Sequence, residues 1–261
     1  MIGFIGYGNM AQAIVQGLVE HDVVQAKDII ACAAHYNKLE ENAKKYGIIP
    51  CHSVQDVINT ADVIVIAIKP YQIESVLTPF AQQLAESKKC IISLAAGWNL
   101  AQYQKLLGNK VAVQCIIPNT PIAVGRGVVV SEDVHTLSQA QQDEFERLFG
   151  SIALIERVDS AHMNIAMSIA GCAPAFTDMY LEALGDAGVK HGLQRQTAYR
   201  IAAKMIEGVG ALYSATGSHP GVMKDAVCSP GGTTIKGVAE LERQGFRGSV
   251  IAAVDAIENA K

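Results

Sequence analysis

The first half of the chain alternates short, continuous apolar runs with segments of helical periodicity, and no other feature restricts the fold as strongly. The apolar runs lie at residues 1–5, 29–33, 63–68, 90–94 and 111–117. Helical patterns separate them near residues 9–20, 37–46, 71–86 and 99–107. Continuous apolar strands joined by helices are typical of parallel strands that are covered on both faces. We therefore predict a doubly wound α/β sheet.

The second half has a different pattern, because the strand signal ends near residue 158. A helix near 138–149 and a strand near 152–156 complete the sheet half. Further helical patterns lie near residues 160–187, 195–215, 220–227, 232–243 and 247–260. Pro174 should break or kink the first of these, because proline has no N–H to donate. We expect an α/β sheet domain over residues 1–157 and an all-helical domain over residues 158–261.

The composition is that of a folded chain and argues against several binding classes. Half of the 261 residues are apolar and 18% are charged, which is enough to bury a full core. The net charge of −4 leaves no basic surplus for a phosphate backbone, so we expect no nucleic-acid partner. No two of the six cysteines form a CxxC pair and the histidines lack ligand spacing, so we expect no metal.

The amino terminus carries no charge before Glu20, but we predict neither a signal peptide nor a membrane anchor. A basic n-region is missing, and glycines and polar side chains interrupt the apolar residues of this segment. The scattered thiols are typical of a reducing compartment. We expect a cytoplasmic protein without a membrane partner.

A glycine-rich turn follows the first predicted strand and opens the first predicted helix. Gly6 would make the tight turn, Gly8 would let the backbone approach a pyrophosphate, and Ala11 would allow close packing of the helix on the strand. The free N–H groups of the first helical turn would hold the phosphates. This turn predicts that residues 1–157 form a Rossmann-like, dinucleotide-binding domain. The alternative is a turn that serves packing alone. We expect the cofactor-binding residues of this turn to be Gly6, Tyr7, Gly8, Asn9, Met10 and Ala11.

The end of the second predicted strand bears on which dinucleotide is bound. NAD sites usually place an acidic residue there, but residues 31–38 contain no Asp or Glu. His35, Asn37 and Lys38 could instead face a 2′-phosphate, although a solvated Lys38 is an equally good interpretation. The pattern favours NADPH, with NADH as the alternative.

A second motif lies in the helical half, where Ser229-Pro230-Gly231-Gly232 is followed by Thr233 and Thr234. The first four residues form a turn, and the threonines open an amphipathic helix. Successive free amides at such a helix start could bind a carboxylate beside two hydroxyls. The alternative is an ordinary N-cap after a glycine loop.

Read together, these motifs resemble the pyrroline-5-carboxylate reductase family, and the resemblance runs through the whole chain in order. The family's FIGxGNMA turn, AxKP, SxAAG and PNTP elements and its carboxyl-terminal hallmark are matched. The matching residues are Phe4–Ala11, Ala67–Pro70, Ser93–Gly97, Pro118–Pro121, and His219-Pro220 followed by Asp225–Glu242. Such proteins reduce 1-pyrroline-5-carboxylate to L-proline, the last step of proline biosynthesis, with NAD(P)H. The family also implies at least a homodimer, intertwined through the helical half.

The resemblance assigns a role to each motif. The predicted cofactor-binding residues include His35 and Asn37 in addition to the glycine turn. The resemblance adds a cofactor track lined by Ala67, Ile68, Lys69, Pro70, Ala95, Ala96 and Gly97. It also implies that Pro118 and Asn119 lie beside the nicotinamide. It implies a substrate site at Ser229, Gly231, Gly232, Thr233 and Thr234. The amides of Thr233 and Thr234 would hold the carboxylate. The Thr234 hydroxyl would hydrogen-bond the ring nitrogen, which makes Thr234 the predicted catalytic residue.

Two departures and three alternatives accompany this interpretation. Gly171–Phe176 lacks hydroxyls that a GSGPAY element provides in members, and Cys172 lies within it. Cys115 stands where members commonly have an arginine, and we expect it to be buried and structural. A β-hydroxyacid dehydrogenase is disfavoured because residues 160–174 contain no lysine. A reductase of another cyclic imine and a non-catalytic nucleotide-sensing paralogue stay open.

Overall fold

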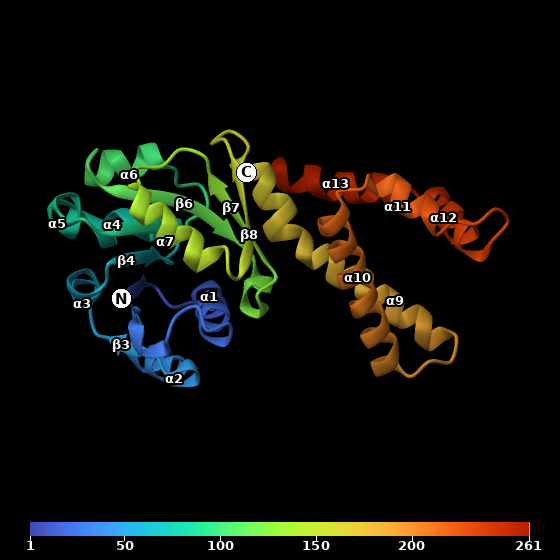
Figure 1. The fold of residues 1–261 in the computed structure, drawn as a ribbon, viewed down its shortest axis with the longest axis horizontal. Helices are drawn as coiled ribbons and strands as arrows, with labels where there is room; N and C mark the ends of the chain where they lie inside the picture. The colour runs from blue at the N-terminus through green and yellow to red at the C-terminus, as the bar shows by residue number, and fades with distance from the viewer. Residues whose placement is uncertain (261) are drawn as a thin grey trace. The chain divides into compact units, whose positions relative to one another are not determined.

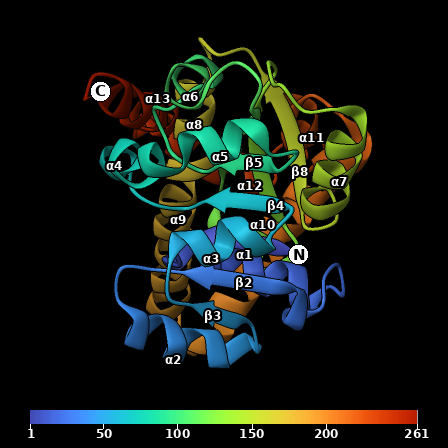
Figure 2. The ribbon, with the colours of Figure 1, turned by 90° about the vertical axis from the view of Figure 1, so that its left-hand side faces the viewer.

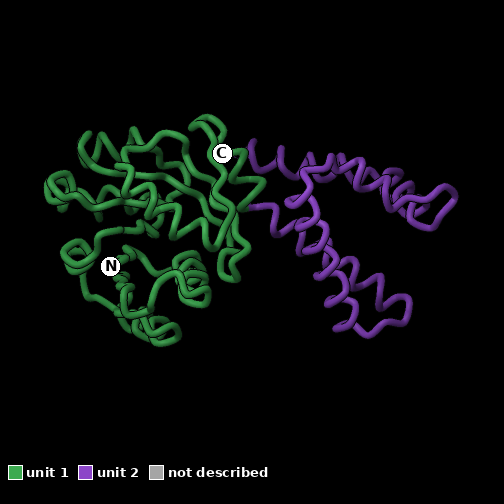
Figure 3. Tube along the Cα trace, viewed as in Figure 1, with its two compact units in different colours: residues 1–171 green, residues 172–261 purple. Residues whose placement is uncertain are grey.

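The computed structural model describes residues 1–260 and contains two compact units, which divide between Gly171 and Cys172 (Figure 3). The first unit holds every strand, and the second is helical. This arrangement confirms the predicted fold class of a Rossmann-like sheet followed by helices. No helix among residues 1–260 is long and apolar enough to cross a membrane.

The sheet of the first unit has eight strands in the order β3-β2-β1-β4-β5-β6-β7-β8 (Figures 1 and 2). All neighbouring strands are parallel except β6 and β7. The chain winds outward from β1 to β3 and then resumes with β4 on the other side of β1. The strands are β1 (Ile2–Ile5), β2 (Ile29–Cys32), β3 (Ile49–Cys51), β4 (Val63–Ile66), β5 (Cys90–Ser93), β6 (Ala112–Pro118), β7 (Gly127–Glu132) and β8 (Ala153–Val158).

Two of these strands were not predicted. Strand β3 contains Pro50, which removes a backbone donor and is tolerated because β3 is an edge strand. Strand β7 contains three consecutive valines, Val128–Val130, which favour a strand. It was missed because no α-helix separates it from β6, so it does not fit the predicted alternation of strands and helices. Its antiparallel pairing with β6 brings Ser131 opposite Ile116.

Helices cover both faces of the sheet, because alternate side chains of each strand enter different cores. Phe4 and Val65 belong to one apolar cluster, whereas Ile5 and Ile64 belong to the other. The helices of the unit are α1 (Asn9–Glu20), α2 (Tyr36–Tyr46), α3 (Val54–Thr60), α4 (Ile73–Leu77), α5 (Ala81–Glu86), α6 (Leu100–Leu107), α7 (Gln139–Phe149) and α8 (Met163–Met167). The predicted helix near 71–86 is divided, because Pro79 lies in a 3₁₀ turn between α4 and α5.

The helical unit agrees closely with the sequence pattern. It contains α9 (Ala173–Lys190), α10 (Arg195–Thr216), α11 (Pro220–Ala226), α12 (Thr233–Arg243) and α13 (Phe246–Glu258). A π-helical turn, Ser168–Cys172, precedes α9 and ends two residues before Pro174. Such a turn is one way for a chain to accommodate the missing N–H of a proline. The predicted irregularity at Pro174 is therefore present as a change of helical pitch.

Candidate active site

A cavity of about 920 Å³ opens at the carboxyl ends of the parallel strands. It lies where the strand order reverses between β1 and β4, which is the place where open α/β sheets bind their ligands. The loops that follow β1, β2, β3, β4 and β5, together with the end of β6, line it. The lining residues at the first turn are the predicted Gly6, Tyr7, Gly8, Asn9, Met10 and Ala11.

Two glycines of this turn have different geometric reasons for lacking a side chain. Gly6 has φ +94°, and a Cβ there would lie 2.5 Å from the Ala67 carbonyl oxygen. The Gly6 N–H donates to the Cys32 carbonyl at 2.9 Å, which ties the turn to β2. Gly8 is the N-cap of α1, and a Cβ there would meet no atom within 4 Å. Gly6 thus serves the fold, whereas the open side of Gly8 fits the approach of a dinucleotide pyrophosphate.

The amino terminus of α1 meets the cavity at this turn. An α-helix leaves the N–H groups of its first turn without intrahelical acceptors, and the helix dipole makes this end electropositive. The first turn of α1 contains no acidic residue, and its N-cap, Gly8, has no side chain that could accept a hydrogen bond from the free N–H groups. These features leave the end of α1 available for an anion such as a phosphate.

Buried hydroxyls hold the β5–α6 loop at the far side of the cavity. The Ser93 hydroxyl lies 2.7 Å from the Tyr103 hydroxyl and accepts the Ala95 N–H at 3.2 Å. Burial raises the pKa of Tyr103, so this phenol stays protonated and can hydrogen-bond. Ala95 and its neighbour Ala96 line the cavity, together with the segment Ala67–Pro70 after β4.

The predicted carboxylate loop of the helical unit forms a tight turn before α12. Gly231 has φ +70°, and the Gly232 N–H donates to the Ser229 carbonyl at 3.0 Å. Gly232 is the N-cap of α12 and has no side chain with which to cap it. Thr233 and Thr234 are exposed in the first turn, which contains no acidic residue. The loop therefore presents free N–H groups and two hydroxyls to a small anion.

Comparisons with known proteins agree with this geometry. A family model for pyrroline-5-carboxylate reductase dimerisation matches residues 160–261, and one for coenzyme F420-dependent NADP oxidoreductases matches residues 1–97. The pyrroline-5-carboxylate reductase of Treponema pallidum is 42% identical over 259 residues, which is 98% of this chain and 97% of the relative. The chain belongs to the pyrroline-5-carboxylate reductase family. This membership confirms the resemblance drawn from the five motifs.

Other pyrroline-5-carboxylate reductases support the same membership. That of Escherichia coli is 34% identical and covers 97% of this chain and 94% of its own length. The structure of the Plasmodium falciparum enzyme with NADP bound has a TM-score of 0.86 and 27% identity, covering 98% of this chain and 94% of that one. The Streptococcus pyogenes enzyme has a TM-score of 0.85 and 31% identity, with coverages of 100% and 97%.

Three of the predicted cofactor residues do not line the cavity of this family member. Asn37 is exposed on α2, and Gly97 follows the lining residues of the β5–α6 loop. Asn119 is 7% exposed, and backbone groups occupy both ends of its amide. Its Oδ1 accepts the Val128 N–H at 2.8 Å, and its Nδ2 donates to the Ala170 carbonyl at 2.9 Å. A cofactor role for these three residues stays a prediction.

The cavity lining near β2 and β3 includes residues that the motifs did not identify. His52, Ser53 and Val54 enter the lining from the turn after β3. The His52 ring stacks on that of Tyr36 with 3.9 Å between ring centroids. These residues were missed because β3 itself was missed. The lining contains no Asp or Glu, and its basic side chains are His35, Lys38, His52 and Lys69.

Two expectations about reactive groups can be compared with the structure. Cys115 is buried at 2% exposure, and burial raises its pKa, in keeping with a structural role. All six cysteines are free. Within residues 1–260, no three His, Cys, Asp or Glu side chains gather in a group that could hold a metal ion.

Proposed function

We infer that this chain reduces 1-pyrroline-5-carboxylate to L-proline with NAD(P)H, the last step of proline biosynthesis. The chain is a member of this family, and the observation that carries the inference is the geometry at Gly8. This residue is the N-cap of α1, and a Cβ there would meet no atom within 4 Å. That feature fits a dinucleotide, and the turn before α12 offers the amides that a small carboxylate needs. Positioning supplies much of the rate in such a reaction, because a protonated imine already accepts a hydride readily.

Each part of the site has one task in this proposal. Bound NAD(P)H supplies the hydride that the imine carbon receives. The glycine turn and α1 hold the pyrophosphate. The segment Ala67–Pro70 and the β5–α6 loop contact the cofactor along its length and hold it in place. Thr233 and Thr234 hold the carboxylate through their N–H groups. The Thr234 hydroxyl orients the ring nitrogen and hydrogen-bonds to it as it becomes an amine.

The direct test of the function is a substrate comparison. Oxidation of the reduced cofactor is followed by its near-ultraviolet absorbance with the five-membered imine carboxylate and then with the six-membered one. We expect the five-membered imine to be reduced with the higher kcat/KM. A preference for the larger ring would favour reduction of another cyclic imine, and NADPH binding without turnover would favour the nucleotide-sensing alternative.

We propose NADPH as the preferred cofactor, because the adenosine side of the cavity carries basic residues and no carboxylate. His35, Lys38 and His52 are the groups that would meet a 2′-phosphate. Replacing Lys38 and His52 together with alanine should raise KM for NADPH by about tenfold, the loss of one or two hydrogen bonds to a charged group. The KM for NADH should stay within about twofold, because NADH lacks that phosphate.

The control for this prediction is Lys44→Ala on the same helix. Lys44 is exposed, pairs with Glu40 at 3.9 Å and does not line the cavity. Its replacement should leave both KM values unchanged. Equal losses for NADPH and NADH in the double variant would contradict recognition of the 2′-phosphate.

We propose at least a homodimer, formed through the helical domain over residues 158–261, and larger assemblies of such dimers. In the described part of the helical unit, the buried apolar side chains are only Ala198 and Ala202. Helix α10 instead exposes an apolar stripe at helical spacing, which needs a partner surface. The stripe consists of Ile201, Met205, Val209 and Leu212.

Light scattering tests the assembly. The unmodified chain of 27.7 kDa should give a mass of at least two chains, and Val209→Glu should shift it toward one, because the stripe would then bury an unpaired charge. A single-chain mass for the unmodified protein at working concentration would refute the proposal.

We also propose a cytoplasmic location, which agrees with six free thiols.

A further inference from the structure

One carboxylate in the described residues is buried, and it lies outside the cavity lining. Glu132, at the end of β7, is 1% exposed, and no other acidic side chain among residues 1–260 is buried. Burying a carboxylate without compensation is costly, so its partners indicate what the group is for. None of the ion pairs formed by the described residues includes Glu132.

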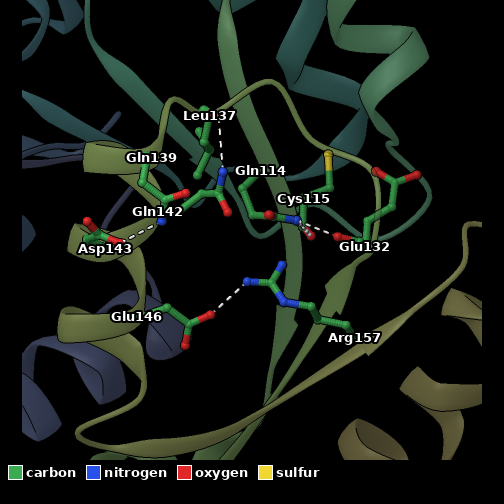
Figure 4. A network of polar contacts seen from close by, with 9 residues as sticks. All are labelled: Gln114, Cys115, Glu132, Leu137, Gln139, Gln142, Asp143, Glu146 and Arg157. Carbon is green, nitrogen blue, oxygen red and sulfur yellow. Dashed lines mark hydrogen bonds and ion pairs between the residues drawn. The ribbon is translucent and has the colours of Figure 1, made fainter.

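Two neutral donors bind the Glu132 carboxylate. The Leu100 N–H donates to Oε2 at 3.1 Å, and the Ser160 hydroxyl donates to Oε1 at 2.5 Å. The Cys115 thiol lies on the neighbouring strand, and its pKa is raised by burial and by the charge of the nearby Glu132 carboxylate. Figure 4 shows Cys115, Glu132 and Gln114, whose side-chain amide donates to the Glu132 carbonyl at 2.8 Å.

The hydrogen bond between Leu100 and Glu132 is linked to the cofactor cavity through the short loop that precedes Leu100. Leu100 is the first residue of α6, so the carboxylate binds one of the free N–H groups at the electropositive end of this helix. The loop just before it contains Ala95 and Ala96, which line the cavity. Ser93 fixes the start of the same loop through the Ala95 N–H. Glu132 thus holds the end of a loop whose start is already fixed.

We propose that Glu132 is a positioning residue for the cofactor, which acts by fixing the β5–α6 loop against the cavity. This rests on the proposed use of the cavity for NADPH. Glu132 does not line the cavity, so it acts through the loop. For this positioning role, the side chain at position 132 must accept a hydrogen bond from the Leu100 N–H. The hydrogen bond from Ser160 and contact with the substrate are not required.

Three substitutions at two positions, Glu132 and Ser160, separate positioning from simple stability. Glu132→Ala should raise the NADPH dissociation constant, measured by fluorescence titration, by about tenfold, since a free loop loses its preorganisation. Glu132→Gln keeps one oxygen for Leu100 and should restore the constant to within about threefold of the unmodified protein. Ser160→Ala leaves the Leu100 bond intact and should change it by less than about twofold. The kcat at saturating NADPH should change little in all three.

The outcomes are distinct. If Glu132→Ala folds and lowers the melting temperature without weakening NADPH binding, Glu132 is only structural and the proposal is overturned. If Glu132→Ala does not fold, Leu100→Pro is used instead. It removes the N–H that Glu132 accepts, at a first-turn helix position that accommodates proline. Unchanged NADPH binding in Leu100→Pro also overturns the proposal. If the unmodified protein fails to bind NADPH at all, the proposed function is wrong. Binding titrations need no imine turnover, so they distinguish these results.

Discussion

Thr234→Ala is expected to lower kcat by about two orders of magnitude while NADPH binding stays intact, because the variant lacks the one hydroxyl assigned to the ring nitrogen. The change leaves the backbone of the α12 turn in place, so the carboxylate keeps its amides. Steady-state kinetics with the imine, together with a titration of NADPH, measure the two effects separately. Thr234→Ser should recover most of the turnover, because serine restores the hydroxyl.

The neighbouring threonine provides the control for this prediction. Thr233 also lies in the first turn of α12 and is equally exposed. Its proposed contribution is its backbone N–H, which Thr233→Ala retains, so its kcat should stay within about threefold of the unmodified value. Wild-type kinetics for Thr234→Ala would remove Thr234 from the catalytic role.

Gly8→Val is expected to abolish NADPH binding, with a loss of affinity of at least about two orders of magnitude, because the new side chain would occupy the space of the pyrophosphate. The folded protein has room for it: Gly8 has φ −83° and ψ −170°, extended values that valine adopts readily. A Cβ there would meet no atom within 4 Å. The stability should therefore fall by only about 1 kcal/mol, the cost of a poorer N-cap. Binding titration and thermal unfolding measure the two quantities.

Gly6→Ala is the matched comparison and should give the opposite pattern. At φ +94°, a side chain is strained, and its Cβ would lie 2.5 Å from the Ala67 carbonyl oxygen. We expect a loss of stability of about 2–4 kcal/mol before any effect on binding is considered. If Gly8→Val bound NADPH with unchanged affinity, the pyrophosphate would have to lie elsewhere.

The candidate site shows how far motifs can place side chains. The glycine turn, Ala67–Pro70 and Ala95–Ala96 all line one cavity, because each follows a parallel strand and these strands end at one edge of the sheet. Asn119 belongs to an equally specific motif, yet its amide is taken by Val128 and Ala170. Ala170 is 51 residues away along the chain, and no local pattern predicts such a partner.

His52 was missed for the opposite reason, a weak local signal. A three-residue edge strand that contains Pro50 does not look like a strand, and pairing with β2 is what stabilises it. Once β3 forms, the turn after it reaches the same edge of the sheet as the other strands.

The sequence by itself determined the features that depend on neighbours along the chain. Apolar runs and helical periodicity determined six of the eight strands and most of the helices. Gly6 determined a turn that needs a positive φ, and Pro174 an irregular helix. Only the tertiary structure decided the antiparallel placement of β7 and the burial of Glu132. The partners of that carboxylate lie 32 and 28 residues away. The free energy of a buried charge depends on such donors, and only the folded chain brings them together.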